Sequence, residues 1–235
     1  MAEPRVLLII PAYNEASNLE QVIDEARANL GADIVVVDDG SIDATGEIAL
    51  KKGVELLALP FNLGIGGAMQ TGYRFARDGG YDIAVQLDGD GQHDASLVPQ
   101  LIEPLIRNDC DLVVGSRYLI KNNYSGPRSR RLGTAIFSRI LSLLLRQRLT
   151  DATSGFRAAN RNLIGQFALE YPRDYPEVEA LLLVHMAHRR IREIPVTMRL
   201  REGGSSSINA IRSVYYMVKV LLALSVIASR RRQPL

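Results

Sequence analysis

Cysteine and histidine are scarce in this sequence, and each shortage excludes a kind of site. Cys110 is the single cysteine among 235 residues, so there is no disulfide framework, and the composition is typical of a reducing compartment. The three histidines, His93, His185 and His188, are too scattered to indicate a zinc site. A hydrophobic content of 47% supports a sizeable core instead.

Long uncharged runs are also missing. In the apolar segment Ile208–Ser229 the longest uncharged stretch is Val220–Ser229, only ten residues, whereas a membrane-spanning helix needs roughly 20 apolar residues. The short apolar run at the N-terminus ends at Pro11, which indicates a first strand rather than a signal peptide. Repeats, low-complexity segments and linkers are not found, so we do not divide the chain.

The small net charge of +2 conceals two halves of opposite sign. Residues 1–115 contain 7 Lys or Arg and 19 Asp or Glu, a net charge of −12, whereas residues 116–235 contain 21 and 7, a net charge of +14. An acidic half suits metal binding, and a basic half suits phosphate groups, anionic lipid or nucleic acid. Aromatic residues do not alternate with the basic ones, which disfavours nucleic acid as a partner.

Apolar runs alternate with helical patterns through the first half and predict an α/β fold. Five strands are expected, at Val6–Ile10, Ile34–Val37, Val54–Leu59, Ile83–Leu87 and Leu112–Gly115. Strands separated by helices favour an open, mostly parallel sheet flanked by helices. In such sheets ligands bind beyond the carboxyl ends of the strands, so polar clusters that follow different strands should converge there.

Three polar clusters follow the expected strands. They are Pro11–Glu15, Asp38–Ser41 and Asp88–Gln92. Asp88 and Asp90 can both turn toward one divalent cation, because such cations prefer oxygen ligands and Gly89 between them allows a tight bend. A solvated turn or a helix cap explains each cluster equally well by itself. Three clusters at strand ends favour a shared site.

Two amphipathic helices are expected in the basic half, at Arg131–Arg148 and Ile208–Ser229. In the first helix one stripe is apolar and comprises Leu132, Ile136, Ile140 and Leu144. Basic helices with one apolar face bind anionic membrane surfaces. We therefore expect both helices to lie on a membrane surface, with packing into the protein core as the alternative.

Five short motifs occur along the chain: Pro11–Glu15 (PAYNE), Asp38–Ser41 (DDGS), Asp88–His93 (DGDGQH), Gly115–Tyr118 (GSRY) and Asp151–Arg157 (DATSGFR). In this order and at this spacing they resemble family-2 glycosyltransferases with the GT-A fold, in particular the polyprenyl-phosphate branch that includes dolichyl-phosphate mannose synthase. The resemblance extends from about Val6 to about Ser207. It implies a nucleoside-diphosphate sugar as donor, GDP- or UDP-linked, and Mg²⁺ or Mn²⁺ as cofactor.

The resemblance also implies roles for residues of the donor site. The nucleoside would contact Pro11, Tyr13, Glu15, Val37 and either Asp38 or Asp39. The metal and the diphosphate would contact Asp88, Gly89, Asp90 and Gln92. Arg201 matches a donor-phosphate arginine, but Ser207 stands where a lysine is expected, which leaves the donor with one fewer cation. The segment Tyr171–Glu179 has no assigned role and is either part of a sugar pocket or a capped helix start.

On the acceptor side, the resemblance implies that Arg117, Arg130, Arg131 and Thr134 bind a lipid phosphate. Arginine suits this role because its planar fork donates two hydrogen bonds to one phosphate. Asp151 is expected near the acceptor as a base or as an orienting group. A phosphate is already ionised and needs no base, whereas a sugar hydroxyl does. The predicted catalytic residues are therefore Asp90, Asp151 and Arg117.

Together these interpretations predict one GT-A domain over 1–207, with a donor half at 1–115 and an acceptor half at 116–207, and a membrane-surface helix with a basic tail at 208–235. The predicted reaction is inverting sugar transfer to a polyprenyl phosphate. The protein would be peripheral, at the cytoplasmic face of a membrane, alone or held by a small integral-membrane partner, and a homo-oligomer is left open. Two alternatives remain: transfer to a glycan or glycolipid hydroxyl, and a non-catalytic nucleotide-sugar-binding subunit.

Overall fold

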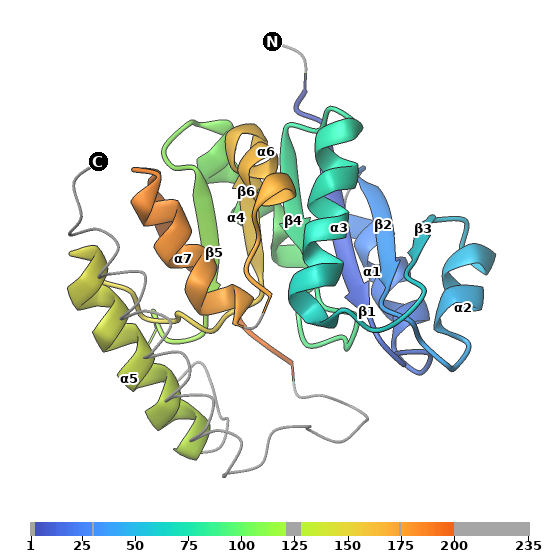
Figure 1. Ribbon diagram of the computed structural model, residues 1–235, viewed down its shortest axis with the longest axis horizontal. Helices are drawn as coiled ribbons and strands as arrows, with labels where there is room; N and C mark the ends of the chain where they lie inside the picture. The colour runs from blue at the N-terminus through green and yellow to red at the C-terminus, as the bar shows by residue number, and fades with distance from the viewer. Residues whose placement is uncertain (1–2, 30, 121–127, 174, 200–235) are drawn as a thin grey trace.

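Seven strands form one mixed sheet in the order β3-β2-β1-β4-β6-β5-β7 (Figure 1). The computed structural model describes residues 3–29, 31–120, 128–173 and 175–199, without the side chains of 128–134 and 137. The strands are β1 (Val6–Ala12), β2 (Asp33–Asp38), β3 (Glu55–Ala58), β4 (Ile83–Gln86), β5 (Leu112–Ser116), β6 (Arg157–Asn160) and β7 (Ile191–Pro195). All five strands expected from the sequence are present, within two residues at each end.

The sheet is parallel apart from one strand. β1 pairs in parallel with β2 and β4, β2 with β3, and β5 with β7, whereas β6 is antiparallel to both β4 and β5. The prediction of an open, mostly parallel sheet is thus confirmed. β6 and β7 were not predicted, since each is short and neither is a continuous apolar run.

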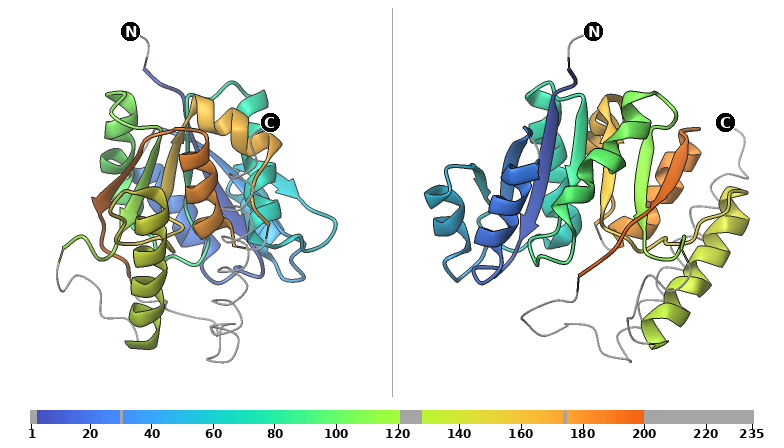
Figure 2. Two further views of the ribbon diagram at one scale, coloured as in Figure 1. Left: turned by 60° about the vertical axis from the view of Figure 1, so that its left-hand side comes forward. Right: turned by 180° about the vertical axis from the view of Figure 1, so that it is seen from behind.

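Helices cover both faces of the sheet (Figure 2). One face carries α1 (Leu19–Asn29), α2 (Thr45–Lys51) and α4 (Val98–Ile106), the last preceded by a short 3₁₀ turn at Ala95–Leu97. The other carries α3 (Gly64–Asp78), α5 (Arg128–Leu145), α6 (Arg161–Leu169) and α7 (Pro176–Met186).

The continuous apolar run of β1 follows from this burial on both sides. Leu7 and Ile9 pack in the core beneath α3, while Leu8 and Ile10 pack in the core beneath α1. All four side chains are fully buried, and burying each one contributes roughly 1.5–3 kcal/mol to stability. A strand with only one buried face would alternate polar and apolar residues.

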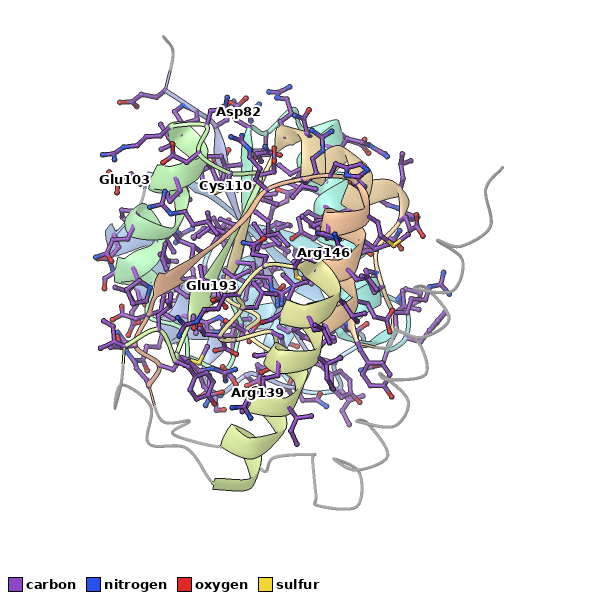
Figure 3. All side chains as sticks on the ribbon, turned by 90° about the vertical axis from the view of Figure 1, so that its left-hand side faces the viewer. Asp82, Glu103, Cys110, Arg139, Arg146 and Glu193 are labelled. Atoms are coloured by element: carbon purple, nitrogen blue, oxygen red, sulfur yellow. The ribbon has the colours of Figure 1, made fainter. Side chains whose placement is uncertain are left out.

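The position of α5 corrects part of the membrane-surface prediction. The helix ends at Leu145 rather than near Arg148, and Arg146 has a left-handed φ of 52°. Leu141 and Leu145 are buried in the core, so the second half of the apolar face packs against the protein, as the alternative held. Leu143 is 81% exposed. Figure 3 shows Arg139 on the same helix, in the part that extends away from the body of the domain.

No helix among the described residues is both long and apolar enough to cross a bilayer. The second amphipathic helix, predicted at Ile208–Ser229, and the tail that follows it lie outside the described residues.

Candidate functional site

The loops after β1 and β2 are joined by hydrogen bonds. The Asn14 amide donates to Ser41 Oγ at 2.9 Å, the Ile42 amide donates to Asn14 Oδ1 at 2.9 Å, and the Glu15 amide donates to Thr45 Oγ1 at 2.9 Å. Asn14 has a φ of 54°, a conformation that asparagine tolerates better than most residues. The first two predicted clusters therefore form one unit.

Asp38 and Asp39 differ in what they contact. Asp39 accepts hydrogen bonds from the amides of Leu63 at 2.7 Å and Gly64 at 2.9 Å, so it caps the start of α3. Burial raises the pKa of Asp39, and the two amides counteract this. Asp38 accepts from the Ser41 amide at 2.9 Å. Since both oxygens of Asp39 accept hydrogen bonds from the start of α3, Asp38 is the better candidate to contact a nucleoside.

The other predicted nucleoside residues are of two kinds. The Tyr13 ring is 47% exposed at the end of β1 and free to stack on a base. The Val37 side chain is fully buried in the core, and Val37 pairs with the buried Pro11 in the sheet. Val37 could therefore contact a ligand only through its backbone. The Glu15 carboxylate accepts from Asn18 Nδ2 at 2.8 Å.

The Asp88 carboxylate, just beyond β4, is held by two neighbours. The Asp88 amide donates to His93 Nδ1 at 3.0 Å, so that nitrogen carries no proton and the Nε2 atom, which does, lies 3.5 Å from Asp88 Oδ2. Gln86 Nε2 donates to Asp88 Oδ1 at 3.1 Å. The His93 ring is buried and stacks on Phe156, with 4.8 Å between centroids. His93 is thus an orienting residue, a role the sequence did not reveal.

Asp90 and Gln92 belong to the same tight loop. The Gln92 amide donates to Asp90 Oδ1 at 3.1 Å across Gly91, whose φ of 75° favours glycine. A Cβ on Gly89 would lie 3.2 Å from the Pro11 carbonyl oxygen, so the loop packs directly on the end of β1. The structure therefore brings all three predicted clusters together.

The residues in this loop fit a site for a divalent cation in which phosphate groups of the substrate supply some of the ligands. Asp88 and Asp90 supply two carboxylates, and the Asp88 side chain is 35% exposed. Within the described part of the chain, no group of three or more His, Cys, Asp or Glu side chains could hold a metal alone. Mg²⁺ sites of this kind use one or two carboxylates and complete the shell with water and substrate phosphates.

Gly155 makes room for this carboxylate. A Cβ on Gly155 would lie 2.9 Å from Gln86 Nε2 and 3.2 Å from Asp88 Oδ2. Only the absence of a side chain lets the loop before β6 approach Asp88 so closely. The motif that contains Gly155 thus contacts the loop after β4, and this contact was not predicted.

Arg117 and Asp151, both predicted catalytic residues, form a buried ion pair. Arg117 Nε lies 2.6 Å from Asp151 Oδ2, and Arg117 Nη2 lies 2.8 Å from Asp151 Oδ1. Nη2 also donates to Thr153 Oγ1 at 2.9 Å. Asp151 is 0% exposed and Arg117 is 8% exposed. This geometry favours the orienting role for Asp151 over the base.

Glu193 of β7 supports that pair and was not found from the sequence. Its carboxylate accepts hydrogen bonds from the amides of Thr150 and Asp151, each at 2.8 Å, and from the Thr150 hydroxyl at 2.9 Å. Burial raises the pKa of Glu193, while these donors counteract the rise. Figure 3 shows Glu193 in the body of the domain. A single glutamate in a short strand carries no sequence signal for such a role.

The remaining predicted residues are Arg201, Arg130, Arg131 and Thr134, and the structure shows only their surroundings. The Arg199 amide donates to the Gln92 carbonyl at 3.0 Å, and Met198 forms an isolated antiparallel β-bridge with His93. The chain therefore runs along the Asp88 loop just before Arg201. Arg201 itself lies outside the described residues, and so do the side chains of Arg130, Arg131 and Thr134.

The sheet order and the Asp-Gly-Asp loop beyond β4 define a GT-A glycosyltransferase fold, the class predicted from the sequence. Residues 7–167 match the family model for glycosyl transferase family 2. The chain belongs to this family and is a glycosyltransferase.

Named relatives cover most of the chain. An undecaprenyl-phosphate mannosyltransferase from Micrococcus luteus is 33% identical over 215 residues, covering 87% of this chain and 88% of the relative. A UDP-N-acetylglucosamine–dolichyl-phosphate N-acetylglucosaminyltransferase from Methanococcus voltae is 31% identical over 216 residues, covering 83% and 86%. The names of both proteins give a polyprenyl-type phosphate as acceptor.

A solved structure shares the fold. Glucosyl-3-phosphoglycerate synthase from Mycobacterium tuberculosis, in complex with Mn²⁺, UDP and phosphoglyceric acid, superposes with a TM-score of 0.71 at 22% identity. The match covers 93% of this chain and 78% of the synthase. At this identity the likeness supports the fold alone.

Proposed function

We propose that this protein is an inverting, cation-dependent glycosyltransferase that moves one sugar from a nucleoside diphosphate to a polyprenyl phosphate at a membrane surface. The observation that carries the proposal is the convergence of the loops after β1, β2 and β4, with Gly89 packed on Pro11. The acceptors named for the relatives from Micrococcus luteus and Methanococcus voltae support a lipid phosphate.

The donor binds across the ends of β1, β2 and β4 in this proposal. Tyr13 stacks on the base, and Asp38 and Glu15 accept hydrogen bonds from the nucleoside. Asp88 and Asp90, with Gln92 beside them, would hold Mg²⁺ or Mn²⁺, which neutralises the charge that develops on the leaving diphosphate when it is bound. Gln86 holds the Asp88 carboxylate by a hydrogen bond, and His93 binds the Asp88 amide and lies 3.5 Å from the carboxylate. Arg201 adds a second positive charge.

The acceptor phosphate binds on the side of Arg117. Because Asp151 holds Arg117 through two hydrogen bonds, the guanidinium is oriented before the substrate arrives. A phosphate oxygen is already charged and attacks the sugar without a base, which agrees with the burial of Asp151. Attack opposite the leaving diphosphate inverts the anomeric carbon. Arg130, Arg131 and Thr134, in the first half of α5, would add phosphate contacts.

The membrane surface follows from charge and position. Residues 116–235 carry a net charge of +14, and basic surfaces are attracted to anionic lipid. α5 projects past the edge of the sheet at which the carboxyl ends of the parallel strands lie (Figures 1 and 2). Its exposed side carries Arg139 and Leu143, and Arg146 is exposed directly after its last residue. We propose peripheral binding at the cytoplasmic face, with 208–235 as a further contact.

The test is a transfer assay with Mn²⁺ and radiolabelled GDP-mannose, UDP-glucose or UDP-N-acetylglucosamine, with and without undecaprenyl phosphate. We expect label to enter the lipid fraction only when the lipid phosphate is present. Transfer to a saccharide without lipid phosphate would assign the alternative hydroxyl acceptor. Absence of transfer to every acceptor would overturn the proposal.

A further inference from the structure

Arg157, the first residue of β6, is a buried cation with an unused donor. It is 2% exposed, and its Nε and Nη2 atoms donate to the carbonyl oxygens of Ser154 at 2.7 Å and Ala152 at 3.2 Å. Its Nη1 atom has no hydrogen-bond partner, and no described carboxylate forms an ion pair with it. A buried donor without a partner destabilises a protein by about 1–3 kcal/mol, and a charged one by more.

The register of the sheet brings Arg157 beside the candidate metal site. Arg157 pairs directly with Gln86 of β4, whose amide holds Asp88. Ala159 and Ala84, two residues along each strand, both lie in the core beneath α3, α6 and α7. Since residues two apart in a strand share a face, Arg157 and Gln86 lie side by side on that face.

Glu177, in the first turn of α7, lies within electrostatic range of the same residues. Its side chain is partly buried, and its carboxylate forms no ion pair with a described residue. Burial raises the pKa of Glu177, attraction to Arg157 and Arg117 lowers it, and repulsion by Asp88 raises it. Glu177 therefore lies within the electrostatic field of the donor and acceptor residues. It belongs to Tyr171–Glu179, the segment to which the motifs assign no role.

Arg157 is fully buried and Glu177 is partly buried. Opposite charges that are removed from water without forming an ion pair destabilise the protein unless another group bridges them. A hydroxyl group fits, because it donates to a carboxylate and accepts from a guanidinium at the same time. Tyr73 and Tyr171 are buried in the same core within range of the Arg157 charge, with 5.2 Å between their ring centroids, so the surroundings of Arg157 are partly aromatic. A sugar ring offers adjacent hydroxyls and an apolar face, which matches these surroundings.

We propose that Arg157 and Glu177 bind hydroxyl groups of the donor sugar, in a subsite beside Asp88; the inference rests on the proposed function. The diphosphate at Asp88 and Asp90 then leads directly to the sugar, which extends toward the start of α7. This subsite decides which sugar is accepted, since a group that loses its hydroxyl partner leaves a buried charge unpaired.

The test measures binding, so it does not depend on the acceptor. Calorimetry with Mn²⁺ first identifies the tightest of GDP-mannose, UDP-glucose and UDP-N-acetylglucosamine, and then compares it with its singly deoxygenated analogues. For the wild type we expect one analogue to bind about 10–100-fold more weakly than the parent. For Glu177→Ala we expect that same analogue and the parent to differ by less than about threefold, because the two deletions remove one interaction.

Control measurements separate this subsite from the rest of the donor site. Free GDP or UDP should bind wild type and Glu177→Ala equally, within about twofold, because neither contains the sugar. Glu170→Ala, an exposed glutamate at the end of α6, should discriminate between the analogues like the wild type. Glu177→Gln keeps the shape of the side chain and serves as a second variant if Glu177→Ala does not fold.

Two results would overturn the inference. Equal discrimination by wild type and Glu177→Ala would mean that the charges meet only buried water. Failure of every nucleotide sugar to bind the wild type would overturn the proposed function as well. Tight, discriminating binding without transfer to a lipid phosphate would contradict only the proposed acceptor and would support the sugar subsite.

Discussion

Arg117 and Asp151 form a two-point ion pair inside the protein, with Nε and Nη2 of the arginine 2.6 and 2.8 Å from the two carboxylate oxygens. Asp151 also accepts from the Arg117 backbone amide at 3.1 Å. The pair joins the end of β5 to the loop before β6. Because the pair is buried, removal of either charge takes from the other its opposite charge at close range.

Asp151→Asn should therefore lower the free energy of unfolding by about 3–5 kcal/mol, because Arg117 loses its counter-charge. Urea denaturation followed by circular dichroism measures this. Asp109→Asn is the matched control, since Asp109 and its partner Arg192 are half exposed, and a surface pair contributes about 0–1 kcal/mol. If Asp151→Asn and Asp109→Asn lowered the free energy of unfolding equally, the buried ion pair would contribute no more to stability than a surface pair.

Asp90→Asn should reduce turnover about a thousandfold or more while leaving the fold intact. The reason is that loss of a cation ligand removes several kcal/mol of charge stabilisation on the leaving group. Steady-state rates over a Mn²⁺ titration, with thermal melting as a check on folding, make the comparison. A variant that turns over at the wild-type rate would refute the assignment of Asp90 to the metal.

Gly155→Ala should weaken Mn²⁺ binding by about 10–100-fold, the effect expected when the support of a metal ligand is disturbed. The new Cβ would press on Gln86 Nε2 and on the Asp88 carboxylate, which are ends of side chains, so the fold should survive. Gly165→Ala is the control: its Cβ meets nothing within 4 Å in α6, and it should leave Mn²⁺ affinity unchanged. Calorimetric titration with Mn²⁺ in the presence of GDP or UDP compares the two variants with the wild type, and equal affinities would argue against Asp88 as a ligand.

Glu177→Gln should be more stable than the wild type at neutral pH. The pKa of Glu177 in the folded protein is raised above its ordinary value of 4.5, so its ionisation opposes folding. The wild type loses stability as the pH rises from that ordinary value through the raised pKa, and the variant does not. The difference in unfolding free energy between them should therefore grow with pH across this window.

Urea denaturation of both proteins at several pH values, in parallel with exposed Glu170→Gln, measures this effect. A difference that shrinks as the pH rises would show that the folded protein favours the charged form of Glu177. Glu177→Gln should also bind nucleotide sugars less tightly than the wild type. This is the usual trade-off between stability and function at a binding site.

The double variant Arg139→Glu and Arg146→Glu should bind anionic vesicles at least about tenfold more weakly, because each basic residue near such a surface contributes about 1 kcal/mol. Vesicles containing phosphatidylglycerol, sedimented at low salt, provide the measurement. The double variant Arg77→Glu and Arg189→Glu changes the net charge equally but at the opposite end of the strands. Equal loss in both variants would indicate a net-charge effect rather than docking through α5.

Much of the first half of the fold could be predicted from local patterns. Val6–Ala12 and Asp33–Asp38 are apolar runs that end in polar residues, and each is a strand buried on both faces. Gly64–Asp78 is a helix between β3 and β4, as the alternation of strands and helices predicts. Parallel strands put their carboxyl ends at one edge of the sheet, so the convergence of the clusters followed from their positions after strands.

The second half depended on contacts that no local pattern contains. β6 is only four residues long, and it is stable because it inserts between β4 and β5 with pairs on both sides. The apolar face of α5 was assigned to a membrane, yet Leu141 and Leu145 pack in the core. An amphipathic pattern shows that one face is apolar and does not show what covers it.

By itself, the sequence determined the α/β class, the positions of the first five strands along the chain and the residues with oxygen ligands to offer, because these depend on neighbours along the chain. Only the tertiary structure decided that Asp151 meets Arg117, that Gly155 approaches Asp88, and that Arg157 pairs with Gln86. Those relationships join residues far apart in the chain. Their energy comes from burial and mutual approach, which exist only once the sheet has assembled.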